Sequence, residues 1–317
     1  MSKPVVSIII PAHNHARYLA QSIESVLDQS YPAIELIVLD DGSTDNTREV
    51  LTGYQNRFLW ESHANRGQAA TLNKGWAMAK GDILGYLSAD DRLLPQAVAT
   101  AVAHLDARPE AVLAYCDFNL IGADAGKIRR VHAPPYCYLD MVTRTVCHPG
   151  PGAFFRREAH KAAGGWDAQL RQWPDYAYWL QLGLQGPFIH IPEVLAEFRV
   201  HEASQTFTKL AFERAEEPIR ILERYYARNA HLPQQIAAAQ PQALSSAYLA
   251  SAQLHLRSAR YATATARLLS AGRLHWRNLL TPRAVRLCLH GLLARPVLLF
   301  WSKLTRHKFS PDQETGA

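Results

Sequence analysis

Residues 5–205 alternate between short apolar runs and stretches whose apolar residues recur at helical spacing. The runs at 5–10, 34–39, 58–61, 83–87 and 111–116 predict strands, and apolar runs without alternation are typical of strands buried on both faces of a parallel sheet. Pro11 predicts the end of the first strand. Strands that alternate with helices through short crossovers are parallel, with right-handed connections. The pattern therefore predicts an α/β fold around a mainly parallel central sheet.

The pattern changes twice after the fifth run. Residues 119–145 predict loops with a hairpin, 153–155 a short strand, and 187–199 two short strands. Beyond Thr206 the strand signal ends, and the spacing at 244–256 and 262–269 predicts a helical hairpin that resembles one tetratricopeptide unit. We therefore expect a sheet domain over residues 1–205 and an α-helical C-terminal region over residues 206–317.

The run at 83–87 leads to two adjacent carboxylates, Asp90 and Asp91. Ligands of open α/β sheets bind at the carboxyl ends of the strands. Two neighbouring carboxylates repel each other, and a divalent cation such as Mg²⁺ or Mn²⁺ relieves that repulsion. The alternative is a solvated turn in which Asp91 caps a helix that begins near Leu93.

Charge is distributed unevenly along the chain. The net charge is +6, yet residues 1–205 carry 22 carboxylates against 18 basic side chains. Between Arg224 and Pro311 there are 13 lysines and arginines and no Asp or Glu. The apolar stretch 284–304 contains Arg286, His290, Arg295 and Pro296, which argues against a membrane-spanning helix but permits attachment to an anionic membrane surface. No DNA-reading motif is present, so we expect no nucleic-acid partner.

The four cysteines, at 116, 137, 147 and 288, have no C-x-x-C spacing, which argues against a zinc site or a disulfide framework. The apolar run near the N-terminus is too short for the core of a signal peptide. We therefore expect a cytoplasmic protein, with peripheral attachment to the inner face of the cell membrane as the hypothesis for its basic tail.

Polar motifs occur at the predicted strand ends and further along the chain, as SIIIPAHN, LDDGSTD, NRGQ, LSADD, GGWD, WPDY and FRVHEAS. Their order and spacing over residues 5–205 closely resemble the inverting glycosyltransferases of family 2, which have the GT-A fold. The resemblance implies an enzyme that moves a sugar from a nucleotide-diphosphate sugar to an acceptor hydroxyl with inversion, in the synthesis of cell-surface polysaccharide or glycolipid. It implies a UDP-sugar as the favoured donor, and a carbohydrate or lipid-linked acceptor.

The resemblance assigns donor-binding positions residue by residue. They are Pro11, Ala12 and His13 in the base and ribose pocket, Asp41 at the base with Asp40 beside it, Asn65 and Gly67 in the donor loop, Asp90 at the ribose or metal, and Arg199 on the diphosphate.

The same resemblance implies Mg²⁺ or Mn²⁺ as cofactor, with Asp91 as a metal ligand and His201 as a ligand or a hydrogen-bond partner of the diphosphate. Many relatives carry a further aspartate where Ser88 stands, so the complete set of metal ligands stays open. The competing interpretation of His201 is a buried structural histidine.

Asp175 in WPDY matches the catalytic base of the family. Displacement with inversion needs one carboxylate to accept the proton of the acceptor hydroxyl. A position at a helix start favours its ionised form, whereas burial beside Trp173 and Trp179 raises its pKa. The alternative is that Asp175 only caps this helix.

Two other functions compete with this interpretation. One is a catalytically inactive module that binds nucleotide sugars, which donor hydrolysis with and without Mn²⁺ would distinguish from an enzyme. The other is a sugar nucleotidyltransferase, and it is disfavoured because PAHNHARY lacks the glycine-rich basic phosphate loop that follows the first strand in such enzymes.

Overall fold

The computed structural model describes residues 3–201, 210–289 and 291–292. It divides into two compact units, one formed by Met1–Val142 with Val146–Glu202 and the other by Thr143–Thr145 with Ala203–Ala317. The expected boundary at residue 205 lies outside the described residues. The sequence pattern did not indicate that the short segment 143–145 groups with the helical unit.

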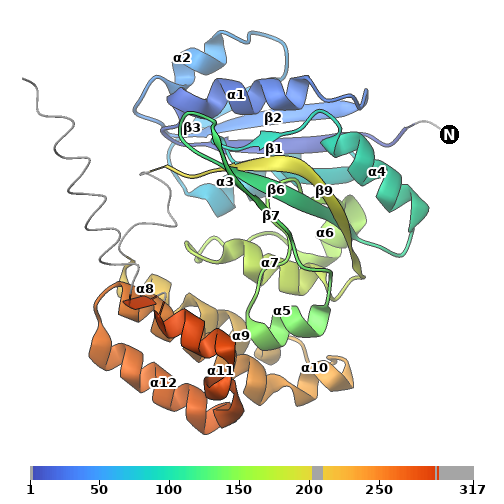
Figure 1. Ribbon diagram of the computed structural model, residues 1–317. Coiled ribbons are helices and arrows are strands. Elements are labelled where there is room, and N and C mark those ends of the chain that lie inside the picture. Colours follow the sequence, from blue (N-terminus) through green and yellow to red (C-terminus); the bar gives the residue numbers. More distant parts are fainter. Residues whose placement is uncertain (1–2, 202–209, 290, 293–317) are drawn as a thin grey trace, which may run out of the picture. The chain divides into compact units, whose positions relative to one another are not determined.

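Nine strands of the described residues form one sheet in the order β3-β2-β1-β4-β8-β6-β9-β5, with β7 paired to β6 (Figure 1). They are β1 (Val6–Ala12), β2 (Ile34–Asp41), β3 (Leu59–His63), β4 (Ile83–Tyr86), β5 (Arg92–Leu93), β6 (Leu113–Ile121), β7 (Lys127–Val131), β8 (Phe154–Arg156) and β9 (Phe188–Arg199). The pairs β2–β3, β1–β2, β1–β4 and β6–β9 are parallel, and the pairs of β8, β5 and β7 are antiparallel. The half of the sheet from β3 to β4 is therefore fully parallel, and its carboxyl ends share one edge.

The first strand does not end at Pro11, as the sequence predicted, but continues to Ala12. The carbonyl of Ile9 accepts the backbone N–H of Leu87 on the β4 side, and Pro11 faces the same side two residues later. Because β4 ends at Tyr86, no ladder bond is required there, and a residue without an N–H is tolerated.

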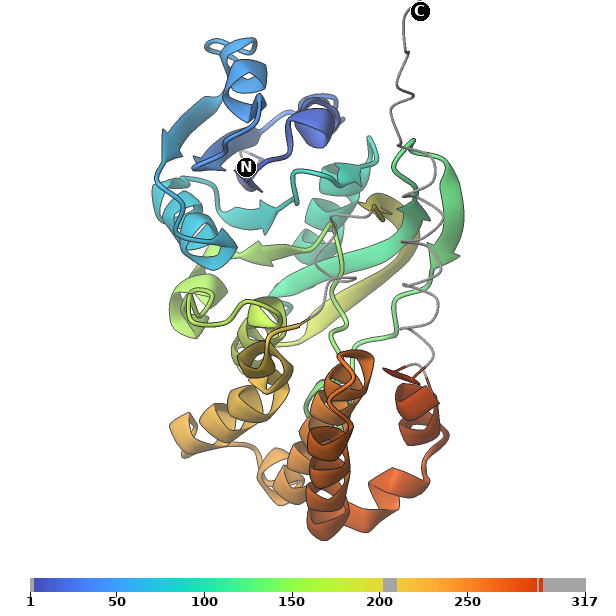
Figure 2. The ribbon, with the colours of Figure 1, turned by 90° about the vertical axis from the view of Figure 1, so that its left-hand side faces the viewer.

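The segment 187–199 forms one strand rather than the expected two, because β9 absorbs a bulge instead of breaking. Its register with β6 shifts between Cys116 and Phe118, opposite Pro192 and Glu193. The expected hairpin is present, since β6 and β7 pair antiparallel, and Figure 2 shows β6 between β7 and β9. A short helix in this region, α5 (Tyr138–Arg144), was not predicted.

Helices cover both faces of the sheet in the first unit (Figure 1). They are α1 (Ala16–Leu27), α2 (Thr47–Thr52), α3 (Gln68–Met78), α4 (Ala97–Ala107), α5 (Tyr138–Arg144), α6 (Arg157–Ala163) and α7 (Pro174–Leu182). Alternation along β1 sends Ile8 and Ile10 into the core shared with α1, α2 and α4, whereas Ile9 lies against Gly75 of α3. Helix α4 begins at Ala97, after β5, so the alternative in which Asp91 caps it is wrong.

The second unit is helical in its described residues, with α8 (Phe212–Ala215), α9 (Glu217–Arg228), α10 (Gln234–Ala238), α11 (Gln240–Arg257) and α12 (Tyr261–His275). Helices α11 and α12 pack against each other as the predicted hairpin. Their tight connection places Ala259 at φ 58°. None of the helices described here is long and apolar enough to cross a membrane. Most of the apolar stretch 284–304 lies outside the described residues.

Candidate active site

The predicted donor residues gather at the carboxyl ends of the parallel strands. Asp40 and Asp41 end β2, His13 follows β1, Asn65 follows β3, and Asp90 follows β4. Parallel pairing in register places these ends at one edge of the sheet. The topology therefore brings together side chains that lie up to 77 positions apart in the sequence.

Asp41 organises the loop after β3 through backbone contacts. Its Oδ1 accepts the N–H of Arg66 at 2.7 Å and its Oδ2 accepts the N–H of Gly67 at 2.8 Å. Gly67 has φ 88°, and a Cβ there would collide with the guanidinium of Arg171. Asp41 is buried, so its carboxylate shapes the loop, and a base contact of the kind expected from the sequence stays a prediction.

Asp40 holds the turn between β2 and α2. Its Oδ1 accepts the N–H of Ser43 at 3.0 Å and its Oδ2 accepts the hydroxyl of Ser62 at 2.6 Å. Burial alone would raise the pKa of Asp40, but the hydrogen bonds from Ser43 and Ser62 outweigh it and the net pKa is lowered. Asp40 is therefore ionised and fully engaged by the protein.

The side chains of His13 and Asn65 contact each other at this edge of the sheet, and both are exposed. The Nδ1 of His13 lies 2.9 Å from the carbonyl of Asp41, which can only accept, so Nδ1 carries the proton. The amide nitrogen of Asn65 lies 3.2 Å from Nδ1 and 3.4 Å from Nε2, and in this tautomer only Nε2 can accept from it. The pair forms a polar rim beside the buried Pro11 and Ala12.

Three side chains from distant segments converge on one point. His201 Nε2 lies 2.9 Å from Asp90 Oδ2, and His15 Nε2 lies 3.9 Å from the same oxygen. One possible ligand atom from each of the three side chains lies within 4.8 Å of the other two. Among the described residues, this is the one cluster of His, Cys, Asp or Glu that could hold a metal ion. Two imidazoles and a carboxylate can bind a divalent cation, and the histidines favour Mn²⁺ over Mg²⁺ because Mg²⁺ prefers oxygen ligands.

Asp91 lies outside this group, although the sequence assigned it as the metal ligand. Its Oδ1 accepts the backbone N–H of Arg199 at 2.8 Å, and its side chain is buried. Burial and the neighbouring charge of Asp90 raise the pKa of Asp91 well above its usual value. Asp90, rather than Asp91, faces the two histidines in this structure, and ligation of a metal by Asp91 stays a prediction.

Arg199 was expected to neutralise the diphosphate, but the structure directs its guanidinium toward the protein. It donates to the carbonyls of Asp90, Gly122 and Ala123 and to the side chain of Gln21, at 2.8–3.2 Å. Its guanidinium also stacks 4.7 Å from the ring centroid of Tyr18. Arg199 is 1% exposed. Because its guanidinium donates to the carbonyl of Asp90, it holds the backbone at Asp90 close to β9.

Asp175 lies in the first turn of α7, next to Pro174, and the N-cap position belongs to Trp173. Its Oδ1 accepts the N–H of Tyr176 at 2.8 Å, and the thiol of Cys147 lies 3.9 Å from its Oδ2. Burial raises the pKa of the Cys147 thiol well above its usual value, and the charge of Asp175 raises it further. Cys147 is therefore a neutral thiol, and its S–H can donate to the carbonyl of Pro149 at 3.3 Å or to Asp175 at 3.9 Å.

Tyr86 lies at the end of β4, and the charges of both Asp91 and Asp175 act on its phenol. Burial raises the pKa of its phenol, and the charges of Asp175, Cys147 and Asp91 raise it further. Its ring packs 5.1 Å from that of Trp166, in the GGWD motif. Asp175 and Asp91 thus both act on the phenol of Tyr86, the last residue of β4 before the Asp pair.

Sequence reasoning missed His15, Cys147 and Tyr86 as members of the site. His15 could have been found from the H-N-H spacing after the first strand, because two histidines in a loop at a ligand-binding edge form a common metal-ligand pattern. Cys147 carried no signal, since a lone cysteine is more often buried for packing than for function.

Comparison with known proteins agrees with this arrangement. The model of glycosyl transferase family 2 matches residues 7–163. A glycosyltransferase of Rickettsia typhi, itself uncharacterised, is 31% identical over 215 residues, which cover 65% of this chain and 67% of the relative. The chondroitin synthase of Escherichia coli is 28% identical over 211 residues but only 30% of its length is covered.

Solved structures show the same fold at low identity. The S. aureus TarS 1–349 structure in complex with UDP-GlcNAc has a TM-score of 0.66 and 17% identity, with 94% of this chain and 92% of that chain covered. The mannosyltransferase PcManGT from Pyrobaculum calidifontis, in complex with GDP-Man and Mn²⁺, has a TM-score of 0.62 and 20% identity, with 96% and 89% covered. With the family match, the Rickettsia relative and the shared GT-A fold, the chain belongs to glycosyl transferase family 2.

Proposed function

We propose that this glycosyltransferase moves a sugar from a nucleotide-diphosphate sugar to an acceptor hydroxyl with inversion at the anomeric carbon. The observation that carries the proposal is the meeting of His15, Asp90 and His201 at the carboxyl edge of a parallel sheet, and the charge of Asp175 acts on Tyr86 at the end of β4. Structures of similar fold bind UDP-GlcNAc and GDP-Man, which supports a nucleotide sugar as donor and leaves the base open.

The donor site is built from the residues that follow β1, β2 and β3. Pro11 and Ala12 form its apolar floor, and His13 with Asn65 provides polar atoms at its mouth. Asp40 and Asp41 hold the surrounding turns, and Gly67 lets the loop backbone approach closely. We assign the base and the ribose of the donor to this surface.

His15, Asp90 and His201 would hold Mn²⁺ or Mg²⁺, which when bound stabilises the negative charge of the departing nucleotide diphosphate. Arg199 and Asp91 keep this donor set in place, because together they tie the backbone at Asp90 to β9. The other ring nitrogen of His15, Nδ1, is buried and has no hydrogen-bond partner among the described residues.

Asp175 acts as the general base in this proposal. Its carboxylate accepts the proton of the acceptor hydroxyl while that oxygen attacks the anomeric carbon from the face opposite the leaving group. One carboxylate is sufficient, since direct inversion forms no covalent sugar-enzyme intermediate. The Cys147 thiol lies 3.9 Å from Oδ2, and the N–H of Tyr176 donates to Oδ1 at 2.8 Å, so the protein contacts both oxygens of this carboxylate.

The acceptor is proposed by analogy with the relatives. Chondroitin and hyaluronan synthases are among them, which supports a role in the synthesis of cell-surface polysaccharide or glycolipid. We retain a carbohydrate or lipid-linked acceptor, and a cytoplasmic location at the inner face of the membrane, as parts of the proposal. The basic composition of residues 224–311 supports the membrane part.

A donor screen followed by product analysis tests the proposal. UDP- and GDP-sugars are added with Mn²⁺, and a true donor at about 100 times its Kd adds roughly 2.7 kcal/mol of stability, which thermal unfolding detects. NMR of the glycoside formed then gives the anomeric configuration, and retention of the donor configuration would overturn the inverting mechanism. Binding without hydrolysis or transfer in Mn²⁺ would instead identify an inactive binding module.

A further inference from the structure

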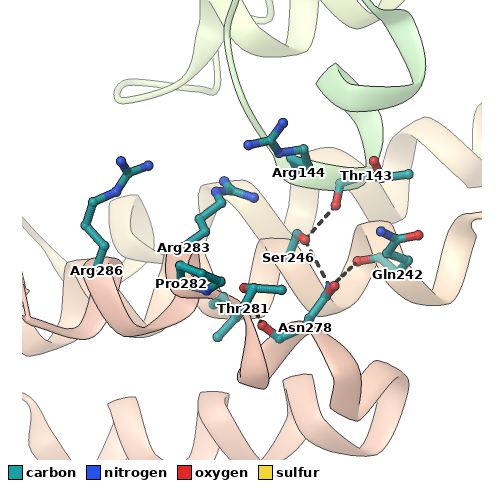
Figure 3. A pocket seen from close by; sticks show the side chains of 10 residues that line it. Thr143, Arg144, Gln242, Ser246, Asn278, Thr281, Pro282, Arg283 and Arg286 are labelled. Carbon is teal, nitrogen blue, oxygen red and sulfur yellow. Dashed lines mark hydrogen bonds between the residues drawn. The ribbon is translucent and has the colours of Figure 1, made fainter.

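The helical unit contains a cavity of about 540 Å³, and none of its lining residues is among the proposed donor or metal residues. Its walls come from three segments that are far apart in the sequence (Figure 3). Thr143 and Arg144 lie at the end of α5, Ser246 lies on α11, Asn278 precedes the helical residues 282–289, and Arg283 and Arg286 lie within them.

The polar walls are held by a connected set of hydrogen bonds. Ser246 Oγ donates to the carbonyl of Thr143 at 2.6 Å, and Asn278 Nδ2 donates to Ser246 Oγ at 3.1 Å and to the carbonyl of Gln242 at 3.0 Å. Arg283 donates to the carbonyl of Thr145 at 3.5 Å. These bonds fix the segment 143–145 against α11 and the residues around Asn278.

Thr145 shows that this segment is held in an unfavourable conformation. Its φ of 48° is rare for a β-branched residue, and its buried hydroxyl has no hydrogen-bond partner among the described residues. Backbone strain of this kind persists only where the surroundings impose it. Here it presents the preceding side chain, that of Arg144, to the cavity.

The cavity is strongly positive. Three of its ten lining residues are arginines and none is acidic. Arg283 and Arg286 are three positions apart in one helical segment and therefore lie on the same face. Figure 3 shows them side by side, with Arg144 nearby. A concave surface lined by several positive charges attracts anions.

We propose that this cavity binds a phosphate group. Guanidinium groups match the geometry of phosphate oxygens, and the hydroxyl and amide groups of the wall can donate to a further oxygen. The phosphate belongs either to a lipid headgroup or to a soluble phosphate ester, since both present the same chemistry to the three arginines. The inference is independent of the proposed donor and metal residues, so each proposal can fail without the other.

Calorimetry with the full-length protein in metal-free buffer tests the site, with inorganic pyrophosphate as the probe. Arg286 is exposed, so R286Q should fold, and the loss of one charged hydrogen bond should weaken binding about tenfold. R144Q should have a similar effect. R273Q is the matched control, because Arg273 is an exposed arginine of the same unit that does not line the cavity, and it should bind as the unmodified chain does.

The proposal is overturned if the unmodified chain does not bind pyrophosphate, or if R273Q weakens binding as much as R286Q does. Affinity for the nucleotide diphosphate with Mn²⁺ should be the same in R286Q as in the unmodified chain. Flotation with phosphatidylglycerol and phosphatidylcholine vesicles identifies the source of the phosphate. Retention on the anionic vesicles that R286Q reduces assigns a lipid headgroup, whereas pyrophosphate binding without retention assigns a soluble ester.

Discussion

At the scale of single residues, the site depends on which atoms the protein leaves available for substrate. Asp40, Asp41, Asp91 and Arg199 are buried and bonded to backbone groups. Asp90 and Asp175 instead face histidine or thiol groups. The first set therefore shapes the site, and the second set is placed to meet substrate or cofactor.

Asp175→Asn should leave donor affinity unchanged and lower turnover by about 10²- to 10⁴-fold, because the amide cannot accept the acceptor's proton. Steady-state kinetics with calorimetry of donor binding separates the two effects. Asp124→Asn, in an exposed turn where Asp124 accepts the N–H of Gly126, is the control and should keep full activity. If Asp175→Asn lost donor affinity to the same extent as turnover, the aspartate would be a structural residue.

Asp90→Asn and His201→Ala should each weaken Mn²⁺ affinity by at least about tenfold, since each removes a ligand of the proposed set. Asp91→Asn should have little effect on Mn²⁺ affinity, because an amide oxygen can still accept the N–H of Arg199. Titration of Mn²⁺ by electron paramagnetic resonance measures all three variants. Loss of Mn²⁺ affinity in Asp91→Asn alone would restore the ligand that the sequence predicted.

The sequence could locate the site but not orient its side chains. Strand ends are visible in the apolar pattern, so the edge that holds Asp40, Asp41 and Asp90 was predictable. Whether Asp90 or Asp91 faces outward depends on the backbone of β9, which lies 108 positions away from Asp91 and donates the N–H of Arg199. A local pattern does not contain that partner.

At the scale of elements, α3 packs against β1 at a contact that only glycine permits. A Cβ on Gly75 would lie 2.4 Å from Cγ2 of Ile9, at the centre of the parallel half of the sheet. The strand and the helix both lead to the donor edge, since β1 ends beside His13 and α3 begins after Gly67. Their close approach therefore positions two of the loops of the site.

Gly75→Ala should lower the free energy of unfolding by about 1–3 kcal/mol, because the added methyl overpacks the contact with Ile9. Alanine has the higher helix propensity, so a loss of stability would show that packing dominates. Urea unfolding followed by circular dichroism measures the free energy of unfolding of the variant and of the unmodified chain. Gly164→Ala is not a suitable control, because its φ is 81°, whereas Ala70→Gly tests propensity alone within the same helix.

Element types were more predictable than element ends. The parallel strands and the α11–α12 hairpin follow from apolar spacing, whereas the extension of β1 through Pro11 depends on where β4 stops. The continuity of β9 depends on the bulge that its partner β6 accommodates. Such features are decided by neighbouring strands, so they do not appear in the pattern of the segment itself.

At the scale of the whole molecule, the two units place their ionisable groups in different surroundings. In the first unit, burial among aromatic rings lowers the pKa of His160 to about 4, and its Nδ1 lies 2.8 Å from the hydroxyl of Tyr178. In the second unit, burial would raise the pKa of Glu216, but hydrogen bonds from Arg267, His255 and Ser251 outweigh it, and the net pKa is lowered. Folding lowers the pKa of both groups, so both make the protein less stable as the pH decreases, but in different pH ranges.

The first unit should therefore lose stability in a higher pH range than the second. Unfolded His160 takes up a proton below about pH 6.5, whereas the folded side chain resists protonation down to about 4, so stability falls as the pH decreases through that range. Glu216 changes stability in the same direction but at lower pH, because its contribution is complete above its unfolded pKa of about 4.5 and is lost only at more acid pH.

Calorimetric unfolding at pH 7.5, 5.5 and 4.5 tests this order. The variant His160→Phe keeps an aromatic ring but cannot be protonated, so the transition of the first unit should depend less on pH between about 6.5 and 4 than in the unmodified chain. Glu216→Gln should lower the stability of the second unit at pH 7.5 without changing that pH dependence, since it removes the charge that Arg267 and His255 contact. An unchanged pH dependence in His160→Phe would show that other groups cause the acid sensitivity, and the neutral buried histidine would then be only a packing residue.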